Sequence, residues 1–104
     1  MTNMTCSKCG RNLGDLEART SFISVEVMGD EYIYSYFFCN RCDAYTVETY
    51  HDCFMGNDET YAEGPIPKAA GDKTVALIRT CPEPSNKRCA CEAHRSLSNC
   101  RWNP

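Results

Sequence analysis

Two cysteine pairs with Cys-x-x-Cys spacing, Cys6–Cys9 and Cys39–Cys42, constrain the fold of this chain more than any other feature. They bracket a strand-turn-strand pattern, and this is the spacing by which four thiolates bind one metal ion from the two ends of a small sheet. The sequence therefore predicts a small, metal-stabilised, β-rich domain.

The composition explains why a metal would be needed. A chain of 104 residues can bury only a modest core, and this one is poor in leucine. Its nine cysteines are far more than a chain of this length ordinarily carries. We therefore expect cross-links, either metal ions or disulfides, to supply part of the stability.

Metal is favoured over disulfides for the first four cysteines. The N-terminal residues 1–6 lack the charged and apolar regions of a signal peptide, and no apolar run approaches the length of a membrane span. We expect a cytoplasmic protein, in which thiols stay reduced, and the odd number of cysteines also argues against a closed set of disulfides. A periplasmic disulfide protein is the alternative.

The segment between and after the two pairs has the pattern of a three-stranded antiparallel sheet. Residues 21–28 alternate and are rich in β-branched side chains, and Gly29-Asp30 supplies a turn. Residues 32–38 form the returning strand, with Tyr32, Tyr34, Tyr36 and Phe38 on one face. Residues 45–50 are expected to form the third strand.

These residues resemble the zinc-ribbon and rubredoxin-like class over residues 5–50. The resemblance implies a metal site formed by Cys6, Cys9, Cys39 and Cys42, with Zn²⁺ as the first candidate and iron as the alternative. In that class a glycine follows the second cysteine of each pair. Gly10 fits this role; Asp43 departs from it, but aspartate tolerates the left-handed conformation.

The C-terminal half, residues 53–104, is predicted to be an irregular, cysteine-rich extension. Residues 55–71 have the composition of a long loop, and residues 72–79 could form either a helix capped by Asp72 or a fourth strand. We expect this extension to pack on the zinc-ribbon sheet of residues 1–52 and to form one cooperative unit with it.

A second four-ligand metal site is predicted in the extension. Cys81, Cys89 and Cys91 lie close together in a proline-bearing segment, which is typical of a metal-binding loop. The fourth ligand is open among Cys53, His94 and Cys100. Cys53 is preferred, because a ligand just after the sheet would tie the extension to the ribbon.

Charge argues against a nucleic-acid partner. The formal net charge of −3 assumes neutral thiols, and each zinc ion bound by four thiolates adds −2, so one site gives −5 and two give −7. An acidic chain does not bind nucleic acid through non-specific attraction.

The function predicted from these features is that of a structural zinc-binding module that serves a protein partner as an interaction or accessory protein. No familiar catalytic motif is present, and a Cys53 nucleophile activated by His51 is disfavoured, so we expect no enzymatic activity. The alternatives are a rubredoxin-like iron electron carrier and a metal-handling or metal-sensing protein that uses the C-terminal cysteines. The sequence does not define the oligomeric state.

Overall fold

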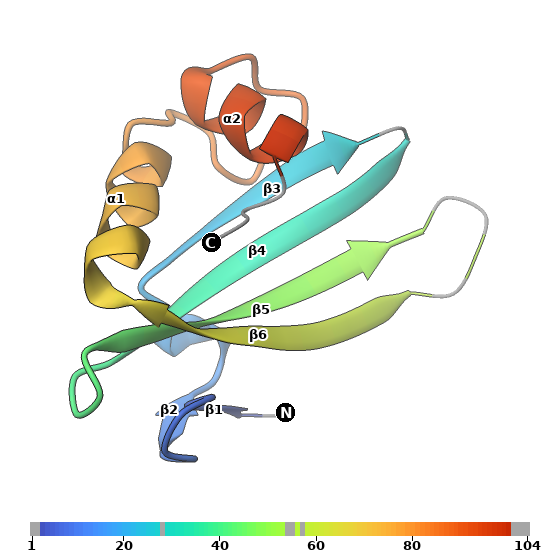
Figure 1. Cartoon of the computed structure of the whole chain (residues 1–104). Helices are drawn as coiled ribbons and strands as arrows, with labels where there is room; N and C mark the ends of the chain where they lie inside the picture. The colour runs from blue at the N-terminus through green and yellow to red at the C-terminus, as the bar shows by residue number, and fades with distance from the viewer. Residues whose placement is uncertain (1–2, 28, 54–55, 57, 101–104) are drawn as a thin grey trace.

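The structure is a computed structural model that describes residues 3–27, 29–53, 56 and 58–100, with the backbone alone for residues 98–100. Its centre is an antiparallel sheet in which neighbours in sequence are neighbours in space, in the order β3-β4-β5-β6 (Figure 1). The strands are β3 (Ser21–Val27), β4 (Asp30–Cys39), β5 (Ala44–Asp52) and β6 (Glu59–Pro67).

The sheet therefore has four strands, and the prediction of three was wrong. The missed strand, β6, lies in the segment that was expected to be a loop, where Gly64, Pro65 and Pro67 favoured irregular structure. Proline is tolerated here because β6 is an edge strand, with one side that needs no hydrogen-bonding partner in the sheet. The register also shifts between Tyr45 and Val47, opposite Gly64 and Pro65, as in a β-bulge.

The C-terminal extension contains two helices and is less irregular than predicted. Helix α1 (Lys68–Arg79) follows β6 directly, and helix α2 (Glu92–Cys100) follows a loop. Of the two alternatives for residues 72–79, the helix is observed, but it begins at Lys68 and Asp72 does not cap it. Asp72 instead accepts hydrogen bonds from Lys68 Nζ and Tyr45 Oη, each at 2.6 Å.

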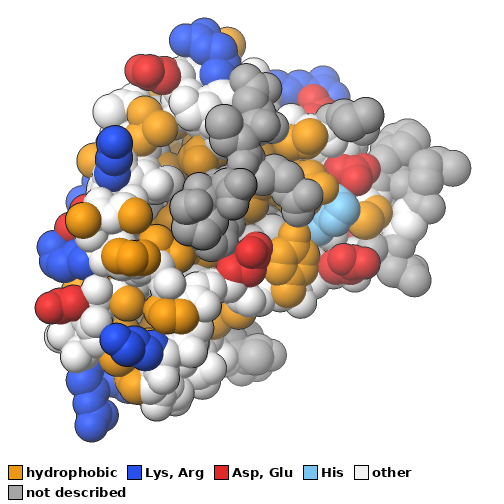
Figure 2. All heavy atoms as spheres, viewed as in Figure 1, with side chains coloured by type: hydrophobic (Ala, Val, Ile, Leu, Met, Phe, Trp, Pro, Cys, Tyr) orange, Lys and Arg blue, Asp and Glu red, His pale blue; other side chains and the backbone are white. Residues whose placement is uncertain are grey.

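Both helices cover the same face of the sheet and contact β3 (Figure 1). The tyrosines at alternate positions of β4 lie on that face, as the period-two pattern predicted, and Tyr34 and Tyr36 are almost fully buried. The core that forms there joins strand residues such as Ile23 and Val47 to helix residues such as Ile78. Other hydrophobic side chains remain visible at the surface of this face, between charged groups (Figure 2).

The N-terminal segment forms a short ribbon of β1 (Met4–Thr5) and β2 (Asn12–Gly14), followed by the 3-10 turn η1 (Leu16–Ala18). It is attached to the main sheet through Ser7, whose backbone N–H donates to Thr46 Oγ1 of β5 at 2.9 Å. Among the described residues, no helix combines the length and the apolar character that crossing a bilayer requires.

Candidate metal centres

The first cluster brings together the four cysteines of the two Cys-x-x-Cys pairs. Cys6 follows β1, Cys39 ends β4, and Cys42 lies just before β5, so the cluster joins the N-terminal ribbon to the β4–β5 turn. The turns after each pair have the conformation that the sequence suggested, since Gly10 has φ 78° and Asp43 has φ 50°. Cys6 and Cys39 are buried, whereas Cys9 is exposed.

The sulfur atoms of this cluster are separated as ligands of one ion would be. Cys6 Sγ lies 4.0 Å from Cys42 Sγ, and Cys9 Sγ lies 3.9 Å from Cys39 Sγ. A disulfide requires about 2.05 Å. A tetrahedral zinc site with bonds of about 2.3 Å places neighbouring sulfurs about 3.8 Å apart. The arrangement therefore fits metal ligation and not disulfide bonding.

The electrostatics of the first cluster divide its thiols into two kinds. Burial acts to raise the pKa of Cys6, but hydrogen bonds from the backbone N–H groups of Cys9 and Lys8 and from neighbouring thiols outweigh it and lower this pKa to about 6. The pKa of Cys42 is raised to about 12, first by its hydrogen bond with Cys9 and then by burial. Without a cation, the cluster resists holding four thiolates at once, because each negative charge raises the cost of the next.

The second cluster consists of Cys81, Cys89, Cys91 and His94. Cys81 lies two residues after the end of α1, Cys89 and Cys91 lie in the α1–α2 loop, and His94 is in the first turn of α2. Cys81 Sγ is 3.8 Å from Cys89 Sγ and 3.4 Å from His94 Nδ1, and Cys91 Sγ is 3.1 Å from the same nitrogen. Tetrahedral zinc places sulfur and imidazole nitrogen about 3.6 Å apart. This set also fits one ion, with Nδ1 as the imidazole ligand.

The structure therefore places His94, and not Cys53, beside the three C-terminal cysteines. Cys53 follows β5 at the far end of the sheet, next to His51. The loop after α1 folds back over β3, and the start of α2 then brings a side chain to Cys81 without help from the sheet. Cys100 ends α2, and its side chain lies outside the described residues.

A sequence signal for His94 was present. It follows Cys91 at the spacing Cys-x-x-His, which is the spacing of a metal-binding knuckle with imidazole in place of the second thiol. The backbone N–H of His94 donates to Cys91 Sγ at 3.4 Å, as N–H groups in such knuckles do. A divalent ion held by three thiolates and one neutral imidazole would add −1, and not −2, to the net charge.

The second cluster has the same electrostatic division as the first. Burial acts to raise the pKa of Cys91, but hydrogen bonds from the backbone and ring of His94 and from the other thiols lower it to about 6. The pKa of Cys81 is raised to about 12 by burial, and then by the hydrogen bond with Cys91. In each cluster, therefore, one thiol loses its proton near neutral pH, and another ionises there only when a cation binds beside it.

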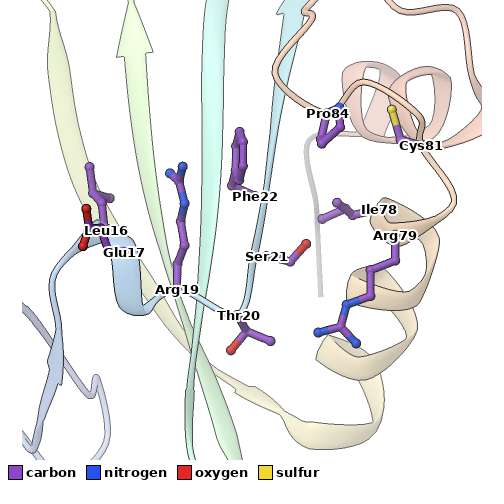
Figure 3. A pocket seen from close by; sticks show the side chains of 10 residues that line it. All are labelled: Leu16, Glu17, Arg19, Thr20, Ser21, Phe22, Ile78, Arg79, Cys81 and Pro84. Atoms are coloured by element: carbon purple, nitrogen blue, oxygen red, sulfur yellow. The ribbon is translucent and has the colours of Figure 1, made fainter.

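A hollow of about 650 Å³ lies beside the second cluster, between η1, the start of β3 and the end of α1 (Figure 3). Cys81 and Pro84 border it on one side and Leu16 borders it on the other. The Arg19 guanidinium stacks on Phe22 at 3.8 Å from the ring centre, and the guanidinium of Arg79 lies apart from it on the helix side of the hollow (Figure 3). The two cations do not converge, so the hollow is not organised around one anion.

No protein-family model, curated protein or solved structure matches this chain. The conclusion about the site therefore rests on its own geometry: both four-residue clusters could hold a metal ion.

Proposed function

We propose that this chain is a structural module that binds two zinc ions and presents the folded surface around them to a protein partner. The observation that supports it most is that each cluster offers four potential protein ligands around one point, contributed by different secondary-structure elements and the turns between them. Four protein ligands close a tetrahedral site, which is typical of structural zinc; catalytic zinc keeps a position for water. For this reason we propose no enzymatic activity at these two sites.

Zinc is favoured over iron by the ligand chemistry of the second cluster. Three thiolates and one imidazole are a common set for structural zinc, whereas rubredoxin-like iron has four thiolates. An iron electron carrier is the competing function, and the absorption spectrum of the purified protein distinguishes the two. Zinc leaves the protein colourless, but ferric iron bound by four thiolates is red.

The partner is proposed to be a protein. The acidic net charge disfavours non-specific attraction to nucleic acid, and bound zinc leaves the charge negative because thiolates outnumber the charges of the ions. Covalent cross-linking of the zinc-loaded chain in extracts of its own cells is the direct test. The expected result is a defined protein adduct that chelated, unfolded chain does not form.

The metal part of the proposal is tested by native mass spectrometry after exposure to a mild chelator. We expect two firmly held zinc ions per chain, one in His94→Ala and one in Cys39→Ser. Cys53→Ser is the matched control, because it removes a thiol that belongs to neither cluster, and it should retain both ions.

Two results would contradict the proposal. Exhaustive chelation should abolish the circular dichroism of the sheet, since much of the binding energy of a structural site is folding energy, so an intact spectrum without metal argues against a structural role. Ready loss of the ion near Cys81 to the mild chelator would favour the metal-handling alternative.

A further inference from the structure

A third group of potential ligands lies at the other end of the strands that carry the first cluster. Asp30 begins β4, His51 lies near the end of β5, and Cys53 follows that strand. The first cluster is at the opposite ends of β4 and β5, and a ten-residue strand spans roughly 33 Å. The third group is therefore remote from the first cluster, and it shares no residue with either cluster.

The ligand atoms of this group already lie close together. His51 Nε2 is 2.8 Å from Asp30 Oδ2 and 3.5 Å from Cys53 Sγ, and all three ligand atoms lie within 4.8 Å of one another. The nitrogen–sulfur separation is close to the edge of about 3.6 Å in a tetrahedral zinc site, whereas the nitrogen–oxygen separation is that of a hydrogen bond and would lengthen to about 3.3 Å around an ion. Small side-chain adjustments would let one ion contact all three.

The imidazole is held in position by its neighbour across the sheet. Tyr32 faces His51 in the β4–β5 register, and the two rings stack with centres 4.1 Å apart and planes 11° apart. Such stacking fixes the plane of the imidazole, as the supporting contacts of metal-binding histidines do.

The acidic groups around Cys53 favour the binding of a cation there over the use of Cys53 as a nucleophile. Burial raises the pKa of Cys53, and the charges of Asp30, Glu59, Asp58 and Asp52 raise it further. Figure 2 shows histidine at the surface between acidic side chains. A free thiolate nucleophile is disfavoured in this field, whereas a divalent ion would be attracted to it and would stabilise the thiolate.

We propose that Asp30, His51 and Cys53 form a third metal site, which binds a divalent transition ion such as zinc through three protein ligands. The side chains of His51 and Asp30 are 16% and 30% exposed, so solvent or a further ligand can reach a fourth coordination position. With three protein ligands in place of four, this site exchanges its ion more readily than the two closed clusters do. Through that fourth position a bound metal could contact an outside molecule.

The test uses the full chain, loaded with zinc and then titrated with a chromophoric chelator of moderate affinity. The expected result is one ion released quickly and two retained. Cys53→Ser and Asp30→Asn, which keep side-chain size, should lose the fast ion and keep the other two. Asp52→Asn is the matched control, because it removes the same charge one residue from His51 without removing a ligand, and it should keep all three ions.

Cobalt gives a second readout that identifies the ligands. Co²⁺ added to protein that retains two zinc ions should produce a sulfur-to-cobalt charge-transfer band, which Cys53→Ser should lack. Bound ion should also slow the alkylation of Cys53 by iodoacetamide at least tenfold, as followed by mass spectrometry.

The inference is overturned if the parent chain never holds more than two ions, or if the fast ion persists in Cys53→Ser. Alkylation of Cys53 at equal rates with and without zinc would show that Asp30 and His51 form an ion pair only. In each case the two firmly held ions are counted in the same experiment, so failure of the third site is separate from failure of the structural module.

Discussion

At Gly71, helix α1 packs closely against the sheet. A β-carbon added there would lie 2.1 Å from Tyr45 Cδ2, and Tyr45 is itself buried and donates its hydroxyl hydrogen bond to Asp72. The same hydrogen bond contributes, after burial, to raising the pKa of Tyr45 to about 12. The helix can therefore pack on the Tyr45 ring only where it has no side chain.

Gly71→Ala is expected to destabilise the protein, although alanine is the better helix former by about 1 kcal/mol. Overpacking against a buried ring costs about 1–3 kcal/mol, so the packing effect should exceed the gain in helix propensity. Urea denaturation of the zinc-loaded protein measures the difference. Lys73→Ala, on the exposed side of α1, is the control and should leave the free energy of unfolding nearly unchanged. If Gly71→Ala proved more stable than the parent, the Tyr45 ring would have to move aside at little cost.

The thiol pKa values predict how metal affinity depends on pH. In each cluster one thiol has a pKa of about 6 and is ionised above that pH; these thiols are Cys6 and Cys91. Another thiol in each cluster has a pKa of about 12 and must release its proton when metal binds; these are Cys42 and Cys81. Zinc affinity should therefore rise with pH. The affinity should change more steeply with pH below about pH 6, because there one more thiol in each cluster, Cys6 or Cys91, must also lose a proton before it can bind metal.

Competition with a chelator of known protonation behaviour, between about pH 5 and pH 8, measures this dependence. The metal-derived stability should be lost as the pH falls, because protons compete for the thiolates. An affinity that does not change over this range would mean that the thiolates are not the ligands.

At the residue scale, the sequence predicted the membership of one cluster better than that of the other. The two Cys-x-x-Cys pairs are local motifs whose geometry is set within four residues, and the structure brings all four cysteines together. The neighbours of Cys81 depend on how the α1–α2 loop folds back, which no short motif specifies. Cys53 was preferred over His94 because a ligand just after the sheet would tie the extension to it, and the Cys-x-x-His spacing of Cys91 and His94 was given too little weight.

At the scale of elements, alternation of side chains predicted the strands that are buried on one face. Residues 21–28, 32–38 and 45–50 match β3, β4 and β5 closely. Strand β6 was not predicted, because most of its residues are exposed and it contains prolines. An edge strand owes its conformation to the neighbour that it pairs with, so its own sequence carries little signal.

Ile66→Ala tests whether β6 belongs to the folded sheet. Ile66 is 4% exposed and pairs with Tyr45, and truncation of a buried isoleucine costs about 2–5 kcal/mol. Denaturation should show a loss of this size. Glu63→Ala, at an exposed position of the same strand, should change the free energy of unfolding little. If Ile66→Ala destabilised the protein no more than Glu63→Ala, β6 would be only loosely attached to the sheet.

At the scale of the whole molecule, the two halves of the chain share one core. Ile23 and Val25 from β3 lie in the same buried cluster as Val75 and Ile78 from α1 and Leu97 from α2. Neither half could bury these side chains without the other. The single core is thus built from both segments that the sequence analysis distinguished, residues 1–52 and residues 53–104.

We therefore expect residues 1–52 and 53–104 to unfold in a single transition. Far-ultraviolet circular dichroism and tyrosine absorbance should give coincident curves in urea. Cys39→Ser and Cys89→Ser, which affect different clusters, should both shift that one transition. Two separate transitions, each sensitive to one variant, would instead indicate independent domains.

The two edges of the sheet are protected in different ways. On β6, Pro65 and Pro67 lack the N–H groups that a neighbouring molecule would need for pairing. On β3, the N–H of Ser24 donates to the carbonyl of Pro84 at 2.8 Å, and Pro84 belongs to the loop between Cys81 and Cys89. A metal ion bound by that loop would therefore also guard against aggregation, because its loss would free the edge of β3 to pair with other copies of the chain.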